Sequence, residues 1–313
     1  MMKRRDLLGK GSFGAIAFTS LGLQSSQAAT TERIGYLFVH GSWHGAWCWG
    51  GVSAHLERAG YACFAVDLPG HGLNAILPSS FGQRPLDPAA FATEPSALAA
   101  YQIDDYANAV LEAAKQARAT GIDKLYLVGH SMGGVPITFA AAKAPDLFEG
   151  LIYIAALAPT PGKPAGAYLG LPDQAANSKL GPAIVADPAV IGALRIDPRS
   201  QDSAYLGALK EALAHDVDDT LLQTVMHYLT PDAPVALYGD VATFPASFQT
   251  LSRSFIICTQ DKTVLPSTAE AIIQDMDKAW TDEATKVLRL STSHEAMFAN
   301  PEQLARLLIQ SLD

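Results

Sequence analysis

The stretch LVGHSMGG, residues 127–134, decides the fold, because it places a serine between glycines at the end of an apolar run. Residues 125–128 predict a short buried strand, and residues 137–142 predict a helix. The stretch matches the pattern G-x-S-x-G, in which a tight strand-to-helix turn exposes the serine hydroxyl. The pattern therefore makes Ser131 a candidate nucleophile.

The backbone N–H of Met132, next to this serine, lies close to the start of the predicted helix and is a candidate oxyanion donor. A five-residue pattern also occurs by chance, and a Gly-rich turn with an inert serine is the alternative. The choice depends on whether a base, an acid and a second oxyanion donor lie where such a serine needs them.

A candidate acid and a candidate base each follow a predicted strand. Asp261 lies in CTQDKTVLP after residues 255–258, and His294 lies in STSHEAMFANPEQ after residues 287–290. A serine nucleophile needs a base to take its proton, and the base needs an acceptor that holds its tautomer. The chain order serine, aspartate, histidine is the one expected for a G-x-S-x-G turn between a strand and a helix.

Other assignments for these residues stay open. Asp261 could instead be a turn or helix-capping residue, in which case Asp240 is the next candidate acid. His294 could instead cap the final helix. Asp67 and His71, in VDLPGHG, resemble a second acid and base, but they follow a different strand, and we expect them to shape a loop.

The second oxyanion donor is predicted in FVHGSWHGAWCWG, residues 38–50. Gly41 allows a sharp turn, so that the N–H of Ser42 can face the same point as that of Met132. His40 and His44 resemble a metal-binding pair, but no third ligand lies near them, and we predict neither a metal nor a cofactor.

The chain alternates predicted strands and helices, which indicates an α/β protein with a mostly parallel sheet covered on both faces. In such a sheet the chemistry gathers at the carboxyl ends of the strands. The strands are predicted at residues 35–39, 61–66, 124–128, 150–156, 254–258 and 286–290, and the main helices at 47–58, 103–118 and 301–312.

Two segments interrupt this alternation. Residues 73–100 are rich in Pro, Ser and Ala and predict a long loop beside the sheet. Residues 158–250 hold short helical stretches, at 204–214 and 219–228 among others, and predict a helical cap over a core formed by residues 29–157 and 251–313. A separate second domain is the alternative, although about ninety residues with many prolines would form a weak core.

The N-terminus predicts an export signal. Paired arginines, Arg4 and Arg5, precede the short apolar segment 13–23, and Ser26-Gln27-Ala28 suits cleavage after about Ala28. Residues 1–28 therefore resemble a twin-arginine signal peptide, with an ordinary Sec signal as the alternative. The apolar segment is too short and too rich in Gly, Ser and Thr for a membrane anchor. We expect a periplasmic or secreted mature protein without a membrane span.

Charge and cysteine content exclude several classes of function. The whole chain has 22 basic and 31 acidic residues, and without Lys3, Arg4, Arg5, Asp6 and Lys10 the mature part has a net charge of −12. Such a charge repels phosphates, so nucleic acid is not an expected partner. The three cysteines, Cys48, Cys63 and Cys258, have neither metal-binding nor disulfide-framework spacing, and we expect them to pack in the interior.

Taken together, these motifs resemble the α/β-hydrolase superfamily, in particular the branch of plant methylesterases, salicylic-acid-binding esterases and hydroxynitrile lyases. The matching pieces are VHGSWHGAWCW, VGHSMGG, IICTQDKTVLP and HEAMFANPEQL, which occur in this order. The resemblance implies an α/β-hydrolase fold with Ser131 as nucleophile, His294 as base and Asp261 as its orienting acid. It also implies an oxyanion hole from Ser42 and Met132.

Departures from that branch bear on the chemistry. The plant lyases carry a threonine where this chain has Gly41 and a lysine where it has Glu295, so the resemblance favours ester hydrolysis. We expect a metal-independent carboxylesterase for small hydrophobic esters. A lyase or another C–C-cleaving enzyme is one alternative, and a non-catalytic ligand-binding protein on the same fold is another. Some bacterial relatives of the branch hydrolyse pyrethroid-type esters. The oligomeric state is left open by the sequence.

Overall fold

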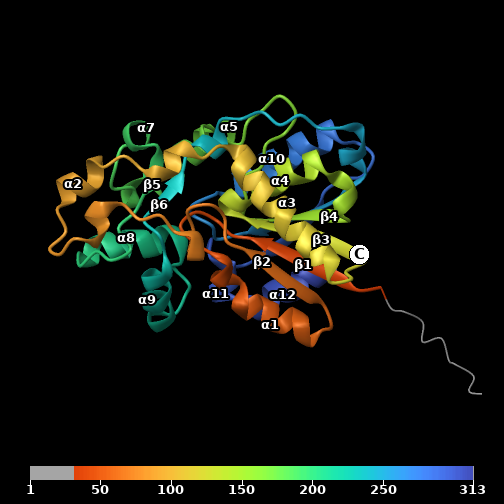
Figure 1. Cartoon of the computed structure of the whole chain (residues 1–313), viewed down its shortest axis with the longest axis horizontal. Helices are drawn as coiled ribbons and strands as arrows, with labels where there is room; N and C mark the ends of the chain where they lie inside the picture. Colours follow the sequence, from red (N-terminus) through yellow and green to blue (C-terminus); the bar gives the residue numbers. More distant parts are fainter. Residues whose placement is uncertain (1–31, 313) are drawn as a thin grey trace, which may run out of the picture. The chain divides into compact units, whose positions relative to one another are not determined.

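The computed structural model describes residues 32–312, and its centre is a six-stranded parallel sheet (Figure 1). The strand order is β2-β1-β3-β4-β7-β8. Within the described residues no helix is both long and apolar enough to cross a bilayer. The strands are β1 Ile34–Val39, β2 Ala62–Val66, β3 Lys124–His130, β4 Gly150–Ile154, β7 Ser252–Cys258 and β8 Lys286–Leu290.

Both faces of the sheet are buried, because successive side chains of a strand point to opposite faces and both sets are apolar here. In β3, for example, Leu125 and Leu127 belong to one hydrophobic core, and Tyr126 and Val128 belong to the other. Helices α3 Ile103–Ala119, α4 Gly134–Lys143 and α10 Pro266–Ala279 cover the first face, and α1 Gly50–Arg58 and α12 Pro301–Gln310 cover the second (Figure 1).

The strand order reverses between β1 and β3. The chain passes from β1 outward to β2, and then returns past β1 to begin β3 on the other side. Ligands of open parallel sheets bind outside the carboxyl ends of the strands at such a reversal. Val39 pairs with Gly129 at the ends of these two strands, so the segments that carry Ser42 and Ser131 leave the sheet side by side.

The α/β class and all six predicted strands are confirmed, with ends that shift by a few residues. The predicted helix at 47–58 begins with a 3-10 turn, Ala46–Trp49, before α1. Helix α10 was not predicted. Its signals were Pro266 at the first turn and the buried, helically spaced Ile272, Ile273 and Met276.

Residues 158–250 form short helices and a small sheet. The predicted helical stretches correspond to α8 Ser203–Leu213 and α9 Asp219–Tyr228. A two-stranded antiparallel sheet of β5 Ala193–Arg195 and β6 Asp232–Pro234 was not anticipated, because three-residue strands leave no alternating pattern. The remaining helices of this segment are α5 Gly166–Leu169, α6 Pro172–Asn177 and α7 Pro188–Ile191.

The predicted loop 73–100 contains one short α-helix, α2 Pro88–Thr93, whose N-terminal N–H groups are capped by the Asp87 carboxylate. The fully buried Arg195 fastens this loop to residues 158–250. Its guanidinium forms a two-pronged ion pair with Asp232, with N···O distances of 2.6 and 2.7 Å. The same guanidinium donates to the carbonyls of Phe91 and Glu94 in the loop.

Removing this guanidinium should destabilise the fold strongly. Arg195→Met leaves the Asp232 carboxylate buried without its cation, which costs about 3–5 kcal/mol in the free energy of unfolding. Urea unfolding followed by circular dichroism measures this cost. The double variant Arg195→Met/Asp232→Leu should recover part of the loss, because no unpaired charge remains. The exposed Arg199→Met is the matched control, and an equal loss in both single variants contradicts the role assigned to Arg195.

Candidate active site

Ser131 lies on a strained turn between β3 and α4. Its φ of 52° falls in the left-handed region, which costs a residue with a side chain about 1–3 kcal/mol. The turn is tight because its glycines pack against backbone. A Cβ on Gly129 would lie 2.7 Å from the Gly133 carbonyl oxygen, and one on Gly133 would lie 2.5 Å from that of Val39. The G-x-S-x-G pattern thus marks a real elbow.

The elbow continues directly into a helix. Ser131–Gly133 forms a 3-10 turn, and α4 begins at Gly134. The first N–H groups of a helix have no acceptor within it, and they carry the positive end of its dipole. Met132 is the second residue of this turn, so its N–H lies at the start of the helix, and its role as an oxyanion donor stays a prediction.

Asp261 and His294 meet in the interior. The Nδ1 atom of His294 lies 2.6 Å from Oδ2 of Asp261, and both side chains are buried. The other carboxylate oxygen of Asp261 accepts the N–H groups of Thr263 and Val264 at 2.7 and 3.0 Å. Asp261 therefore serves both as the turn residue considered above and as the partner of His294. Asp240, the alternative acid, is exposed.

The contact with Asp261 determines the state of the His294 ring. Burial by itself lowers the pKa of His294, but the charge and hydrogen bond of Asp261 raise it, and the net pKa lies above its ordinary value. Because a carboxylate only accepts, the proton of the neutral ring lies on Nδ1. The Nε2 atom is then the acceptor, as a general base requires.

His294 must reach across the sheet to approach Ser131. Strands β3 and β8 are three positions apart in the sheet, or roughly 14 Å at the usual strand spacing. The turn after β8 runs back toward β3, and a residue of the elbow segment holds this turn in place. Nε2 of His130, the residue before Ser131, donates to the carbonyl oxygen of His294 at 3.0 Å.

The C-terminal end of α8 holds the turns of both Asp261 and His294. Its carbonyls at Ala212 and Leu213 accept from Thr263 Oγ1 at 2.8 Å and from the N–H of Glu295 at 3.1 Å. The Asp216 carboxylate accepts from Thr292 Oγ1 at 2.6 Å and from the N–H of Ser293 at 3.0 Å. No sequence pattern marked Asp216.

His40 orients the predicted oxyanion donor after β1. Its Nδ1 donates to the Gly41 carbonyl at 2.8 Å, and its Nε2 accepts the N–H of Leu68 at 3.2 Å. The Gly41 carbonyl and the Ser42 N–H belong to one planar peptide unit and point in opposite directions. By holding the carbonyl, His40 fixes the direction of the N–H.

The next residues form a second strained turn. Trp43 has a φ of 66°, and its carbonyl accepts from the N–H and the Oγ1 of Thr230 at 2.9 and 3.1 Å. The indole N–H of Trp43 donates to the Leu194 carbonyl at 2.9 Å. Residues 158–250 therefore hold the turn that carries Ser42.

The histidines near the site are buried and have individual partners. Burial lowers the pKa of His40 and His130 well below its ordinary value and that of His71 to about 4. As expected, His71 and Asp67 shape the loop after β2, where Asp67 accepts the N–H groups of Ala46 and Leu73. Among the residues that the structure describes, no three His, Cys, Asp or Glu side chains gather as metal ligands.

Ser131 and Ser42 line a cavity of about 240 Å³. None of the described residues that line it carries a charged side chain, and none belongs to the loop 73–100. Gln174 and Ser178 direct their polar atoms to the backbone of residues 262–265 rather than into the cavity. The other lining residues are Trp43, Leu157, Leu169, Ala175, Leu180, Gly181, Leu194, Tyr238, Thr263 and Val264.

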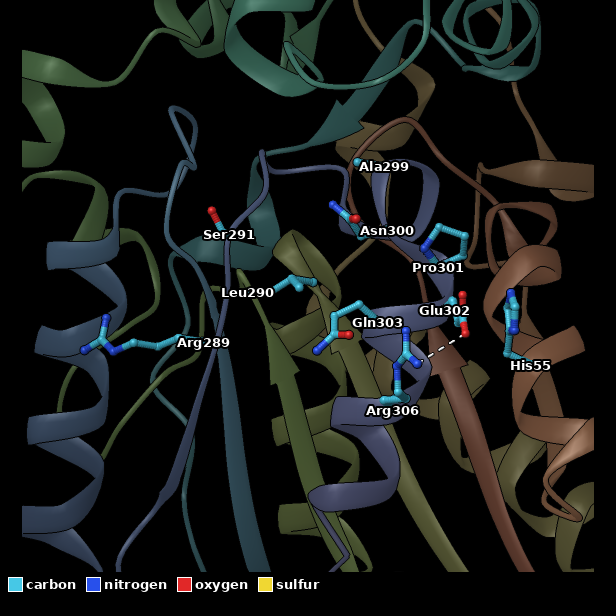
Figure 2. A pocket seen from close by; sticks show the side chains of 10 residues that line it. All are labelled: His55, Arg289, Leu290, Ser291, Ala299, Asn300, Pro301, Glu302, Gln303 and Arg306. Atoms are coloured by element: carbon cyan, nitrogen blue, oxygen red, sulfur yellow. Dashed lines mark ion pairs between the residues drawn. The ribbon is translucent and has the colours of Figure 1, made fainter.

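A larger hollow of about 670 Å³ lies elsewhere, beside the end of β8 and the start of α12 (Figure 2). It is open and polar, and the charged groups within it pair with carboxylates at the surface. Arg306 pairs with Glu302 at 3.3 Å, and Arg289 pairs with Glu270 at 2.8 Å. None of the predicted site residues lines this hollow.

Comparison with known proteins agrees with this architecture. The sequence profile of the alpha/beta hydrolase family matches residues 36–307. Methylesterase 9 of Arabidopsis thaliana is 25% identical over 285 residues, which cover 89% of this chain and 98% of the relative. The probable esterase PIR7A of Oryza sativa subsp. indica is 24% identical over 288 residues, which cover 88% and 95%.

A solved structure has the same fold. The pyrethroid hydrolase from Sphingobium faniae JZ-2 superposes with a TM-score of 0.66 at 21% identity, covering 90% of this chain and 97% of that one. The protein is thus an α/β protein of the hydrolase type. More particularly, it belongs to the alpha/beta hydrolase family, and the predicted resemblance to the plant methylesterase branch is confirmed.

The buried histidines should make the protein sensitive to mild acid. Below pH 6.5 the unfolded chain binds protons at His40, His71 and His130, whereas the folded chain does not until their depressed pKa values are reached. The free energy of unfolding therefore falls as the pH drops, by about 2 kcal/mol for His71 alone between pH 7.5 and 5. His294, with its raised pKa, contributes stability below pH 6.5 and partly offsets this loss.

Urea unfolding at pH 7.5 and pH 5 measures the effect, with His71→Gln as the comparison. The variant should lose less stability than the native chain between these two pH values, since one depressed histidine has been removed. His55→Gln, at a half-buried position away from the site, is the matched control. Equal pH dependence in the native chain and His71→Gln contradicts the expectation.

Proposed function

We propose that the protein is a serine carboxylesterase that hydrolyses small hydrophobic esters through an acyl-enzyme. The observation that carries the proposal is Ser131, a non-glycine residue at positive φ on a strand-to-helix elbow that faces an apolar cavity. The buried contact of His294 with Asp261 supports it, because a base oriented in this way leaves Nε2 free to take a proton.

In the proposed reaction, Oγ of Ser131 attacks the ester carbonyl carbon while Nε2 of His294 takes the hydroxyl proton. The N–H groups of Ser42 and Met132 stabilise the oxyanion, and Asp261 stabilises the imidazolium. His294 then gives the proton to the leaving alcohol as the C–O bond breaks. A water molecule, deprotonated by the same histidine, attacks the acyl carbon and releases the acid and Ser131.

The cavity supports an uncharged substrate. Apolar side chains form most of its wall, and none of the described residues that line it carries a positive charge that could hold a substrate carboxylate or phosphate. Its volume of about 240 Å³ lies just below the usual range of ligand pockets, which favours small esters. The names of similar proteins, a methylesterase and a pyrethroid hydrolase, are compatible with ester substrates.

Gly41 supports hydrolysis over cyanohydrin cleavage. A Cβ at this position would lie 2.8 Å from Nδ1 of His130 and 2.9 Å from Cβ of Ser131. The threonine that the plant lyases carry there would therefore have to displace the elbow. The side chains of His130 and Ser131 leave this position to glycine.

Substitution of the proposed nucleophile tests the mechanism. With p-nitrophenyl butyrate in a chelating buffer, Ser131→Ala should lower kcat/KM by about three orders of magnitude or more, and the native protein should stay active without metal. Ser291→Ala, in the larger surface hollow, is the matched control and should keep its activity.

Two results would overturn the proposal. Equal turnover by the native protein and Ser131→Ala would remove the serine mechanism. A native protein without esterase activity would favour one of the two alternatives. Release of cyanide from a cyanohydrin would then identify a lyase, and tight ligand binding without turnover would identify a binding protein.

We also propose that residues 1–28, which lie outside the described residues, direct export to the periplasm or the medium. The support is the paired arginines and the short apolar segment of the sequence. Expression of the full chain in a bacterium should yield a periplasmic or secreted protein that starts after about Ala28, as N-terminal sequencing would show. Replacement of Arg4 and Arg5 by lysine should block a twin-arginine route and spare a Sec route. A cytoplasmic chain that keeps its N-terminus contradicts export.

A further inference from the structure

A buried pair of titratable side chains, His44 and Glu295, lies beside the site and has no part in the reaction described above. Nε2 of His44 lies 3.3 Å from Oε2 of Glu295, with the two side chains 2% and 4% exposed. A carboxylate as deeply buried as this one is costly unless a cation or a proton compensates its charge.

The hydrogen bonds of His44 indicate where a proton lies. Nδ1 of His44 is 2.7 Å from the carbonyl oxygen of Ser42, and because a carbonyl only accepts, Nδ1 carries a hydrogen. In a neutral ring Nε2 would be a second acceptor 3.3 Å from Oε2 of Glu295, and neither atom has a hydrogen-bond partner among the described residues. Two acceptors so close together in the interior repel each other, which favours one further proton on the pair.

The surroundings place this proton on the histidine. The His44 ring packs beside the rings of Trp47 and Phe298, with centroid distances of 5.6 and 5.9 Å, and those two rings also contact each other. Aromatic faces stabilise a cation at such distances, and an imidazole binds a proton more tightly than a carboxylate does. The geometry therefore favours a His44 imidazolium against a Glu295 carboxylate.

The pair joins two parts of the site that come from distant strands. On one side, His44 holds the carbonyl of Ser42, at the start of the strained turn whose next residue is Trp43. On the other side, Glu295 directly follows His294, and its N–H donates to the Leu213 carbonyl at 3.1 Å. The pair thus spans from the oxyanion turn to the turn of the base.

We propose that His44 and Glu295 form a buried imidazolium–carboxylate pair of positioning residues, which aligns the oxyanion turn with His294 and keeps the charge beside His294 balanced. This inference rests on the esterase function proposed above. The Glu295 carboxylate favours the protonated form of His294, and the His44 cation offsets that effect. The other titratable groups around the pair are His40, His71, His130, Asp67, Asp261, Cys48 and Cys258.

Nitrogen NMR of the histidines tests the protonation state without any need for turnover. At neutral pH the native protein should show a His44 ring with both nitrogens protonated. The signals of this ring are assigned as those that disappear in His44→Gln. In Glu295→Gln the same ring should become neutral with its proton on Nδ1. Glu270→Gln, which removes an exposed carboxylate paired with Arg289, is the matched control and should leave the His44 signals unchanged.

A neutral His44 ring in the native protein overturns the proposal. So does an imidazolium that persists in Glu295→Gln, because Glu295 would then not be its partner. The spectra test the His44–Glu295 pair whether or not the protein hydrolyses esters. A native protein without esterase activity would contradict the proposed function, and the spectra would still decide the protonation state of the pair.

The kinetic test separates positioning from mere stability. His44→Gln leaves the Glu295 carboxylate without its cation, so the acidic limb of kcat/KM should move to higher pH by about one unit. Glu295→Gln removes the negative charge, so the limb should move to lower pH or stay in place. In both variants kcat should fall about tenfold, with KM within about twofold, because the oxyanion donor and the base lose their alignment.

The double variant should lose no more activity than the worse single variant, since the two residues act as one unit. Shifts of the acidic limb in the same direction, or native kinetics in folded variants that only melt earlier, would reduce the pair to a structural contact and overturn the proposal. Should His44→Gln fail to fold, the spectra and kinetics of Glu295→Gln still decide the outcome.

Discussion

The left-handed backbone of Ser131 is the constraint on which the rest of the site depends. It is possible only because Gly129 and Gly133 let the elbow approach its own backbone and that of β1 without a side chain between them. The same close approach sets the segments after β1 and β3 side by side at the reversal of strand order. The order of the sheet therefore accounts for the closeness of the two segments that carry the predicted oxyanion donors. A strained backbone conformation persists where contacts with the surrounding structure hold it in place. One such contact is the hydrogen bond from the Leu157 N–H to the Ser131 carbonyl.

Around the elbow, buried polar groups hold the backbone that carries the predicted site residues. His40 and His130 each hold a backbone carbonyl next to a predicted site residue, and their low pKa values keep them neutral in that role. His40 uses both ring nitrogens in hydrogen bonds, whereas Nδ1 of His130 is buried without a hydrogen-bond partner among the described residues, which is costly in the interior. His294 can have a raised pKa among these neutral histidines, since it alone among them faces the carboxylate of Asp261.

Much of this arrangement follows from the sequence. Apolar runs indicated the six strands, and the glycines around Ser131, with polar residues at the ends of later strands, indicated which loops to bring together. The sequence could not show what depends on short or irregular segments. The three-residue strands β5 and β6 leave no pattern, and Arg195 reads as an ordinary charged residue until its partner Asp232 is placed beside it. Asp216 acts through contacts made only after the turns fold back, so no sequence pattern marked it. The sequence marked Glu295 as a departure from the plant lyases, but it could not show the buried contact of Glu295 with His44.

The hydrogen bonds at the end of α8 bear on how a substrate can reach the cavity. This end belongs to residues 158–250, and it holds the turns of both Asp261 and His294. If the whole segment swung away, Asp261 and His294 would lose the groups that hold their turns. Any opening of the cavity that keeps these contacts therefore has to leave α8 in place. A single chain segment thus braces the turns of Asp261 and His294 at one end and, through residues such as Leu169 and Gly181, forms part of the cavity wall at the other.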